Sequence, residues 1–263
     1  MNELRQLALA WLCETDAAIK ATGVLALAKR GGFHLDAHAV ITSTKVTPGR
    51  PAKPELVSPL DLPKRSMRMH EGRVALIHAL AHIEFNAINL ALDAIWRFED
   101  MPEKYYHDWL KVAAEEAYHF TLLNTHLQSL GYEYGGFSGH NSLWEMVDRT
   151  KNDVLARMAL VPRTMEARGL DASPQLRNKF SQIGDAKMAE ILDIILTDEI
   201  GHVAIGNVWF NWLCAERKLE PIATFARLCV EYSAPKLKPP FNMDARRKAG
   251  FSEAELALLS QAL

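Results

Sequence analysis

Apolar residues recur at steps of three and four along most of the chain, which is the spacing of one face of an α-helix. Alternating patterns that would indicate β-strands are short, and the Asn-Gly and Asp-Gly pairs typical of hairpin turns do not occur. Capping residues, prolines and glycines divide the helical pattern. The predicted helices run over about 3–29, 72–98, 100–131, 142–169 and 185–218, with a short Pro174-led turn before the last and a short helix from Ser252.

Proline-rich segments separate these helices. Five of the twelve prolines lie between Pro48 and Pro63, and three more lie between Pro235 and Pro240. Four long helices joined by short loops predict an all-α protein built on an up-down four-helix bundle. We expect residues 1–70 to form an N-terminal helical segment and strap that pack on the bundle, 71–218 the bundle itself, and 219–263 a C-terminal strap and short helix.

Glutamates interrupt the apolar stripes of all four long helices. Glu84 lies at the centre of the stripe in 72–98, where every other member is apolar. Burying a carboxylate costs several kcal/mol unless a partner neutralises it. The same anomaly recurs in the other three helices, at Glu116, Glu166 and Glu199. We therefore expect these side chains to share a cationic partner.

Two of these glutamates are followed by a histidine three residues later, at His119 and His202. This spacing places a carboxylate and an imidazole on the same helix face. The order glutamate, Glu-x-x-His then repeats, with 32 residues from Glu84 to Glu116 and 33 from Glu166 to Glu199. This is the ligand set of di-iron and di-manganese carboxylate proteins. The predicted metal ligands are Glu84, Glu116, His119, Glu166, Glu199 and His202.

The alternative is that the four glutamates are exposed charges or pair with buried arginines, but no matching set of inward arginines is visible in the pattern. Three neighbouring residues are assigned to the surroundings of the ligands. Glu115 and Asp198 could orient the ligating rings by hydrogen bonds, or exchange roles with Glu116 and Glu199. Tyr118 is near the site by helical position, with core packing as the default role and electron transfer as the alternative. No other catalytic residue is predicted.

Other histidines fit the site less well. His78 and His82 lie on a different face from Glu84, and we expect them to contact another layer, such as the N-terminal helix or a strap. His126 is two turns beyond His119, too far to share a metal with it. Pro162, one turn before Glu166, is expected to kink its helix.

Composition and charge exclude several classes of function. The net charge of −2 excludes a basic field over the whole protein, and no apolar run is long enough to predict a membrane span. The N-terminal residues lack the features of a secretory signal, and three cysteines do not predict a disulfide framework. These features predict a cytoplasmic protein with no membrane partner.

Several motifs resemble those of the ferritin-like superfamily and, more closely, an uncharacterised bacterial family within it. The resemblance covers nearly the whole chain and rests on the two Glu-x-x-His segments together with Gly49–Pro54, Pro63–Arg65, His78–Glu84 and Lys238–Asn242. It implies a ferritin-like four-helix bundle with a di-metal site at the six residues above. It implies no substrate.

Two functions compete for such a site. The first is an O₂-dependent oxidase or oxygenase of hydroxylase type that uses two iron ions, with manganese possible, a small-molecule substrate and an electron donor. The second is a ferroxidase or iron-handling protein of ferritin type. A tRNA-modifying hydroxylase, with basic strap residues such as Arg50 and Arg65 contacting phosphates, and a metal-free scaffold are less favoured alternatives.

Overall fold

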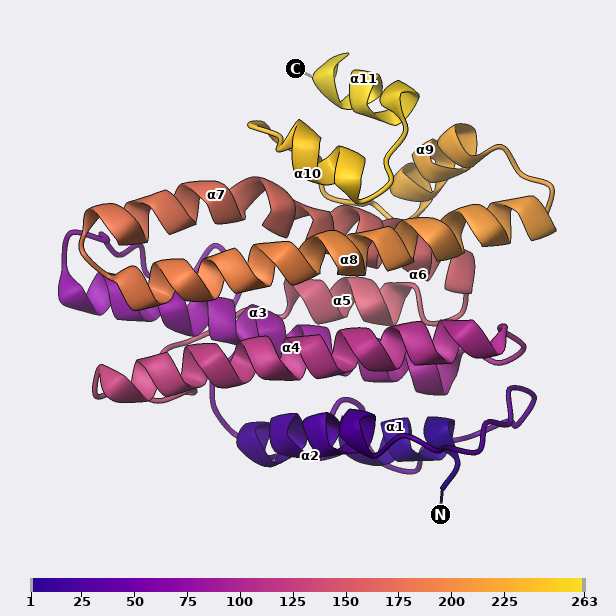
Figure 1. The fold of residues 1–263 in the computed structure, drawn as a ribbon, viewed down its shortest axis with the longest axis horizontal. Helices are drawn as coiled ribbons and strands as arrows, with labels where there is room; N and C mark the ends of the chain where they lie inside the picture. Colours follow the sequence, from indigo (N-terminus) through magenta and orange to yellow (C-terminus); the bar gives the residue numbers. More distant parts are fainter. Residues whose placement is uncertain (1, 262–263) are drawn as a thin grey trace. The chain divides into compact units, whose positions relative to one another are not determined.

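The computed structural model describes residues 2–261, which form helices and no β-strand (Figure 1). The all-α prediction is therefore confirmed for this part of the chain. The chain divides into two compact units, Met1–Trp144 and Glu145–Leu263. Residue 1 and residues 262–263, the outer ends of the first and third predicted parts, lie outside the described residues. The three-part division and the assembly of the long helices into one bundle remain predictions.

The first unit begins with two short helices rather than the single one predicted over 3–29. They are α1 (Leu4–Leu12) and α2 (Ala17–Arg30). The break falls where Asp16 accepts a hydrogen bond from the backbone of Ile19 and so caps a new helix. Gly31, at φ 60°, ends α2 as expected. The helix α1 packs on α3 (His70–Arg97), and α2 packs on α4 (Glu103–Ser129).

The helices α3 and α4 form an antiparallel hairpin, the central element of the first unit (Figure 1). In the turn between them, no side chain caps the start of α4. Asp100 has φ 59° and contacts His38 instead, with Oδ1 2.5 Å from Nδ1. Gly131, at φ 82°, ends α4 as predicted.

The helix α3 is long and apolar enough to cross a membrane by length and composition alone. However, 72 % of its most apolar stretch is buried inside the protein, as in the central helix of a folded core.

The proline-rich strap between α2 and α3 is held to the rest of the first unit by backbone hydrogen bonds. Gly49 N donates to Leu12 O at 2.8 Å, and Val57 N donates to Gly139 O at 2.9 Å. The strap therefore joins the end of α1 to the loop that follows α4.

The second unit contains the remaining helices, with α5 crossing its boundary. They are α5 (Ser142–Arg149), α6 (Val154–Leu160), the π-helix η1 (Val161–Glu166), α7 (Ala167–Gln182), α8 (Ala186–Glu216), α9 (Pro221–Glu231), α10 (Met243–Lys248) and α11 (Glu253–Gln261). Here α7 and α8 form the second long hairpin (Figure 1). The helices predicted from about 185 and from Ser252 begin as expected. Asp185 caps α8, and Ser252 and Glu255 form a capping box at the start of α11.

The single helix predicted over 142–169 is wrong. It is broken after Arg149, where Asp153 caps α6, and the chain turns into a π-helix at Pro162. Proline has no N–H for the helical ladder, so the distortion expected there is confirmed. By contrast, α7 continues through Pro174, which was expected to start a separate turn. It can do so because Asn242 Nδ2 donates to Leu170 O, the carbonyl that residue 174 leaves without its helical donor.

Candidate metal centre

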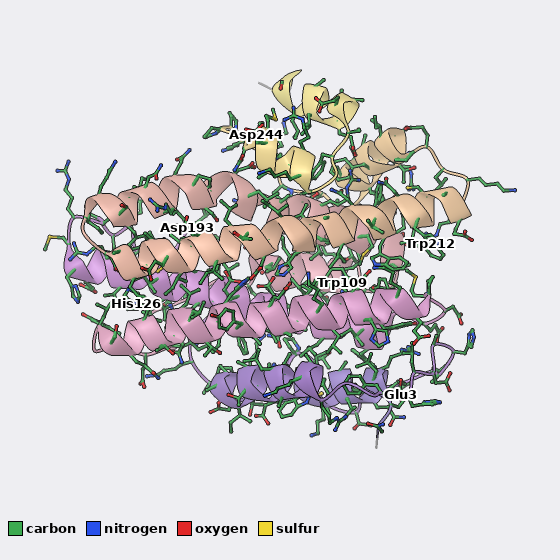
Figure 2. All side chains as sticks on the ribbon, viewed as in Figure 1. Glu3, Trp109, His126, Asp193, Trp212 and Asp244 are labelled. Carbon is green, nitrogen blue, oxygen red and sulfur yellow. The ribbon has the colours of Figure 1, made fainter. Side chains whose placement is uncertain are left out.

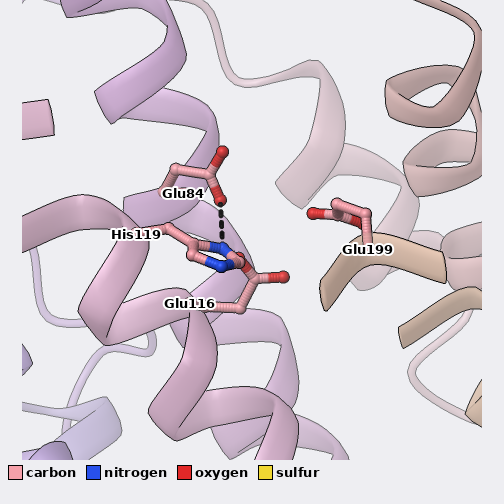
Figure 3. Close-up of side chains that lie close together, drawn as sticks. All are labelled: Glu84, Glu116, His119 and Glu199. Carbon is pink, nitrogen blue, oxygen red and sulfur yellow. Dashed lines mark hydrogen bonds and ion pairs between the residues drawn. The ribbon is translucent and has the colours of Figure 1, made fainter. Parts of the chain in front are cut away.

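The α3–α4 hairpin brings three predicted ligands together in the first unit. Glu84 comes from α3, and Glu116 and His119 come from α4 (Figure 3). His119 Nδ1 lies 3.3 Å from Glu116 Oε2 and 3.6 Å from Glu84 Oε2. Potential ligand atoms of all three lie within 4.8 Å of one another. They are 4 %, 0 % and 0 % exposed, so the apolar stripes carry these groups into the interior as predicted.

The electrostatics of this cluster favour a bound cation. Burial raises the pKa of the Glu84 carboxyl group well above its usual value, and the neighbouring Glu116 carboxylate raises it further. Two carboxylates that are buried next to each other cannot both ionise without a large cost in free energy, unless a positive charge lies beside them. A divalent cation would supply that charge, and two carboxylates with one imidazole suit iron(II) or manganese(II). The donor set of the first unit thus fits a metal ion.

The second unit holds the other three predicted ligands, all buried. Glu166 is the last residue of η1, and α8 carries Glu199 and His202, with Nδ1 of the histidine 3.8 Å from Oε1 of the glutamate. Both η1 and α7 pack on α8. The structure thus confirms the shared helix face of Glu199 and His202. The joining of the six residues into one site remains a prediction, because Glu84, Glu116 and His119 belong to the first unit and Glu166, Glu199 and His202 to the second.

The residues assigned to the surroundings of the ligands are less buried. Glu115 faces Lys111, with Oε1 3.5 Å from Nζ, and Asp198 is half-buried on α8. Tyr118 is 43 % exposed, and its ring centroid lies 6.5 Å from that of His119. Its side chain is therefore not packed in the core, which was the default expectation. Its role in electron transfer remains a prediction.

The remaining histidines contact other groups. His82 Nδ1 lies 2.8 Å from Tyr134 Oη, and His78 Nε2 accepts a hydrogen bond from Gly135 N at 2.9 Å. The layer that they contact through these hydrogen bonds is the loop after α4. Burial lowers the pKa of each imidazole to about 4, so both are neutral at pH 7. His126 is buried towards the C-terminal end of α4, while Trp109 lies in its N-terminal half (Figure 2).

Sequence reasoning missed a set of buried arginines: Arg5, Arg157, Arg163 and Arg246. Two of them pair with carboxylates far along the chain, Arg163 with Glu255 and Arg246 with Asp171. Neither carboxylate is one of the four stripe glutamates. The periodic pattern gives no signal for such pairs, because their partners are 92 and 75 residues away.

Comparisons with known proteins found one listed relative and one matching family. The chain is 52 % identical to an uncharacterized protein of Haemophilus influenzae, over 78 % of this chain and 74 % of that protein. No solved structure matches it. Residues 13–257 match the family described as protein of unknown function DUF455. With its all-helical fold and buried Glu-His cluster, the chain belongs to the DUF455 family.

Proposed function

We propose that this protein is a ferritin-like di-metal oxidoreductase that uses O₂ to oxidise a small-molecule substrate. In this proposal two iron ions, or iron and manganese, are held by Glu84, Glu116, His119, Glu166, Glu199 and His202. The observation that carries it is the buried cluster of Glu84, Glu116 and His119 in the first unit. The same order of residue types in the second unit supports a matching half.

The side chains have distinct tasks in such a site. The four carboxylates balance the charge of two divalent cations, and the neutral imidazoles of His119 and His202 each provide one nitrogen ligand. Phe85 and Phe120, which follow Glu84 and His119 in the chain, are buried and pack against each other. A bound pair of reduced iron ions would supply electrons to O₂ and so the oxidising power for a substrate C–H bond. Hydroxylation with O₂ consumes two further electrons, so an electron donor is required.

Metal analysis of the full-length protein tests the site. Protein purified from cells grown with iron and manganese is expected to contain about two ions per chain. Glu116→Gln and Glu199→Gln each remove one charged ligand and should lose most of the bound metal. The matched control is Glu190→Gln, an exposed glutamate of α8 that pairs with Lys187, and it should keep the wild-type content. Wild-type protein without metal, or two ions retained in both ligand variants, would contradict the proposal.

Oxygen uptake then separates an oxidoreductase from an iron store. Ferrous ions are added without air, and O₂ is then introduced while its concentration is recorded. An oxidoreductase should bind about two irons per chain and consume O₂ repeatedly only with a reductant. Continued loading of many irons per chain would favour the ferritin-type alternative. The same measurements on Glu115→Gln and Asp198→Asn test whether Glu115 and Asp198 are the ligands in place of Glu116 and Glu199. Loss of iron binding in either variant would assign that residue as a ligand.

A further inference from the structure

The connection between α2 and α3 contains an extended stretch, residues 39–44, which we call the edge segment. Its odd-numbered residues are half-buried and its even-numbered residues are exposed, and a period of two is that of an extended chain. From Val40 to Thr44, no backbone N–H donates a hydrogen bond to a described residue. The edge segment therefore has the form of a β-strand that lacks a partner strand.

Buried side chains of the first unit hold one edge of this segment. Ala39 O accepts a hydrogen bond from Arg5 Nη1 at 2.7 Å, and Ile41 O accepts one from Trp96 Nε1 at 2.8 Å. Arg5 and Trp96 are 1 % and 7 % exposed, so both donors are fixed in the core. Backbone groups of successive residues point to opposite edges of an extended chain. The N–H and C=O groups of Val40 therefore point away from these donors.

The opposite edge is open. The backbone N–H and C=O groups of Val40 and Thr42 have no hydrogen-bond partner within residues 2–261. Residues 40–45 also border an open groove of about 440 Å³ beside α1. The side chain of Val40 is 79 % exposed. A second chain can therefore reach this edge without displacing a described residue.

The composition of the edge segment is that of a strand that pairs. It reads Ala-Val-Ile-Thr-Ser-Thr, with no charge, no proline and four β-branched residues. Folded proteins usually protect an open strand edge with a lysine, a proline or a β-bulge, because an unprotected edge pairs with other chains. Residues 39–44 contain neither a lysine nor a proline. This edge is therefore suited to pairing.

The charges that flank the edge segment indicate its partner. Asp36 precedes the segment and Lys45 follows it, both are exposed, and neither forms an ion pair with a described residue. If two copies of the segment pair antiparallel, Asp36 of each copy lies near Lys45 of the other. Parallel pairing would instead bring like charges together. The segment is therefore complementary to a second copy of itself in the antiparallel direction.

We propose that the edge segment pairs antiparallel with the edge segment of a second copy of this chain, and so forms a symmetric homodimer. Val40 of one copy lies opposite Thr42 of the other, and each such pair exchanges two backbone hydrogen bonds. The two-fold axis repeats every contact, including the attraction between Asp36 and Lys45. This interface lies within the first unit and does not depend on the metal proposal.

Sedimentation velocity of the full-length protein tests the dimer. The interface is short, so we expect a weak dimer with a Kd of about 10–100 µM. As the protein concentration rises from about 5 to about 200 µM, the average mass should therefore rise from the 29.5 kDa of one chain towards twice that value. A mass of one chain at the highest concentration would overturn the proposal.

Two substitutions at Thr42 separate backbone pairing from side-chain contacts. Thr42→Pro removes an N–H of the open edge and should weaken the dimer at least about tenfold. Thr42→Ala keeps this N–H and should dimerise like the wild type. The N–H lost in Thr42→Pro has no partner within the described chain, so its Tm should match that of the wild type. Thr42→Pro that dimerises as tightly as the wild type would reject this interface.

Thr42→Lys provides the same test without a change of the backbone. It brings an ammonium group of each copy close to that of the other across the paired edges, so it should also weaken the dimer at least about tenfold. An unchanged Kd in Thr42→Lys would contradict the proposed pairing.

Hydrogen exchange measured by mass spectrometry locates the interface. The backbone amides of the peptide that contains residues 39–44 should exchange more slowly at high protein concentration than at low concentration, because pairing protects them. The same peptide in Thr42→Pro should show no such change. A wild-type dimer in which this peptide exchanges as fast as in the monomer would place the interface elsewhere and reject the proposal.

Discussion

Lys20 is a buried cation outside the candidate metal centre. Its ammonium group donates to Leu12 O, Gly49 O and Asn89 Oδ1, and thereby ties α2 to α1, the strap and α3. Burial, and then the positive charge of Arg50, lower its pKa to about 7. The side chain is therefore a local source of pH-dependent stability.

The free energy of unfolding should rise as the pH increases from 7 towards 10. In this window the unfolded chain, with an ordinary lysine pKa of 10.5, binds a proton that the folded protein does not. The expected gain is on the order of 2–4 kcal/mol. Urea unfolding at pH 7, 8 and 9 measures it. Lys20→Met should flatten this rise, and an unchanged slope in the variant would assign the effect to another group.

His78 should make the free energy of unfolding depend on pH in the acid range. Burial and the neighbouring His82 lower its pKa to about 4, against 6.5 in the unfolded chain. Unfolding therefore takes up protons between pH 6.5 and 4, and stability falls as the pH decreases through this window.

The contribution of His78 is expected to be about 1–3 kcal/mol at pH 4. It can be measured by comparing urea unfolding of the wild type and His78→Gln at pH 7, 5.5 and 4.5. The variant should lose part of the pH dependence, and His107→Gln, at an exposed histidine of α4, should keep all of it. The same slope in all three proteins would show that His78 does not titrate as the structure indicates.

At the scale of elements, the position of η1 depends on one close contact with α8. Pro162 disrupts the α-helical ladder, and its ring packs against Gly206 of α8. A Cβ atom at position 206 would lie 2.5 Å from Pro162 Cβ, so a larger residue must displace η1. Because Glu166 ends η1, this contact also positions a predicted ligand.

Two glycine-to-alanine substitutions should therefore have opposite effects. Gly206→Ala is expected to lower the free energy of unfolding by about 1–3 kcal/mol, because the proline ring cannot move aside freely. Gly169→Ala, in α7, meets no atom within 4 Å and should raise it by about 0.5–1 kcal/mol through the gain in helix propensity. Chemical denaturation of both variants checks the pair. Equal effects would mean that the Pro162 contact is not tight.

At the scale of the whole molecule, the proposed metal pair draws ligands from both compact units. Under that proposal, metal should stabilise the fold by an amount that grows with the logarithm of its concentration above Kd. At 100 times Kd the gain is about 2.7 kcal/mol, seen as a rise in Tm when Mn²⁺ is added. Both Glu116→Gln and Glu199→Gln should lose most of this rise, although they lie in different units. If either variant showed the full rise in Tm on addition of Mn²⁺, one unit would bind the metal alone.

The sequence by itself determined the helical class, the approximate ends of α3, α4 and α8, and the inward direction of the stripe glutamates. These features depend on local rules, namely periodicity, caps and the position of a residue on its own helix face. Glu84, Glu116 and His119 were accessible to this reasoning because two adjacent helices joined by a short turn must pack as a hairpin.

Only the tertiary structure decided the features that depend on distant partners. The passage of α7 through Pro174 and the pairing of Arg246 with Asp171 both involve groups many residues apart. Local propensity does not encode such contacts, because a carbonyl or a charge can be satisfied from anywhere in the fold. The buried arginines could not be predicted from the sequence for the same reason.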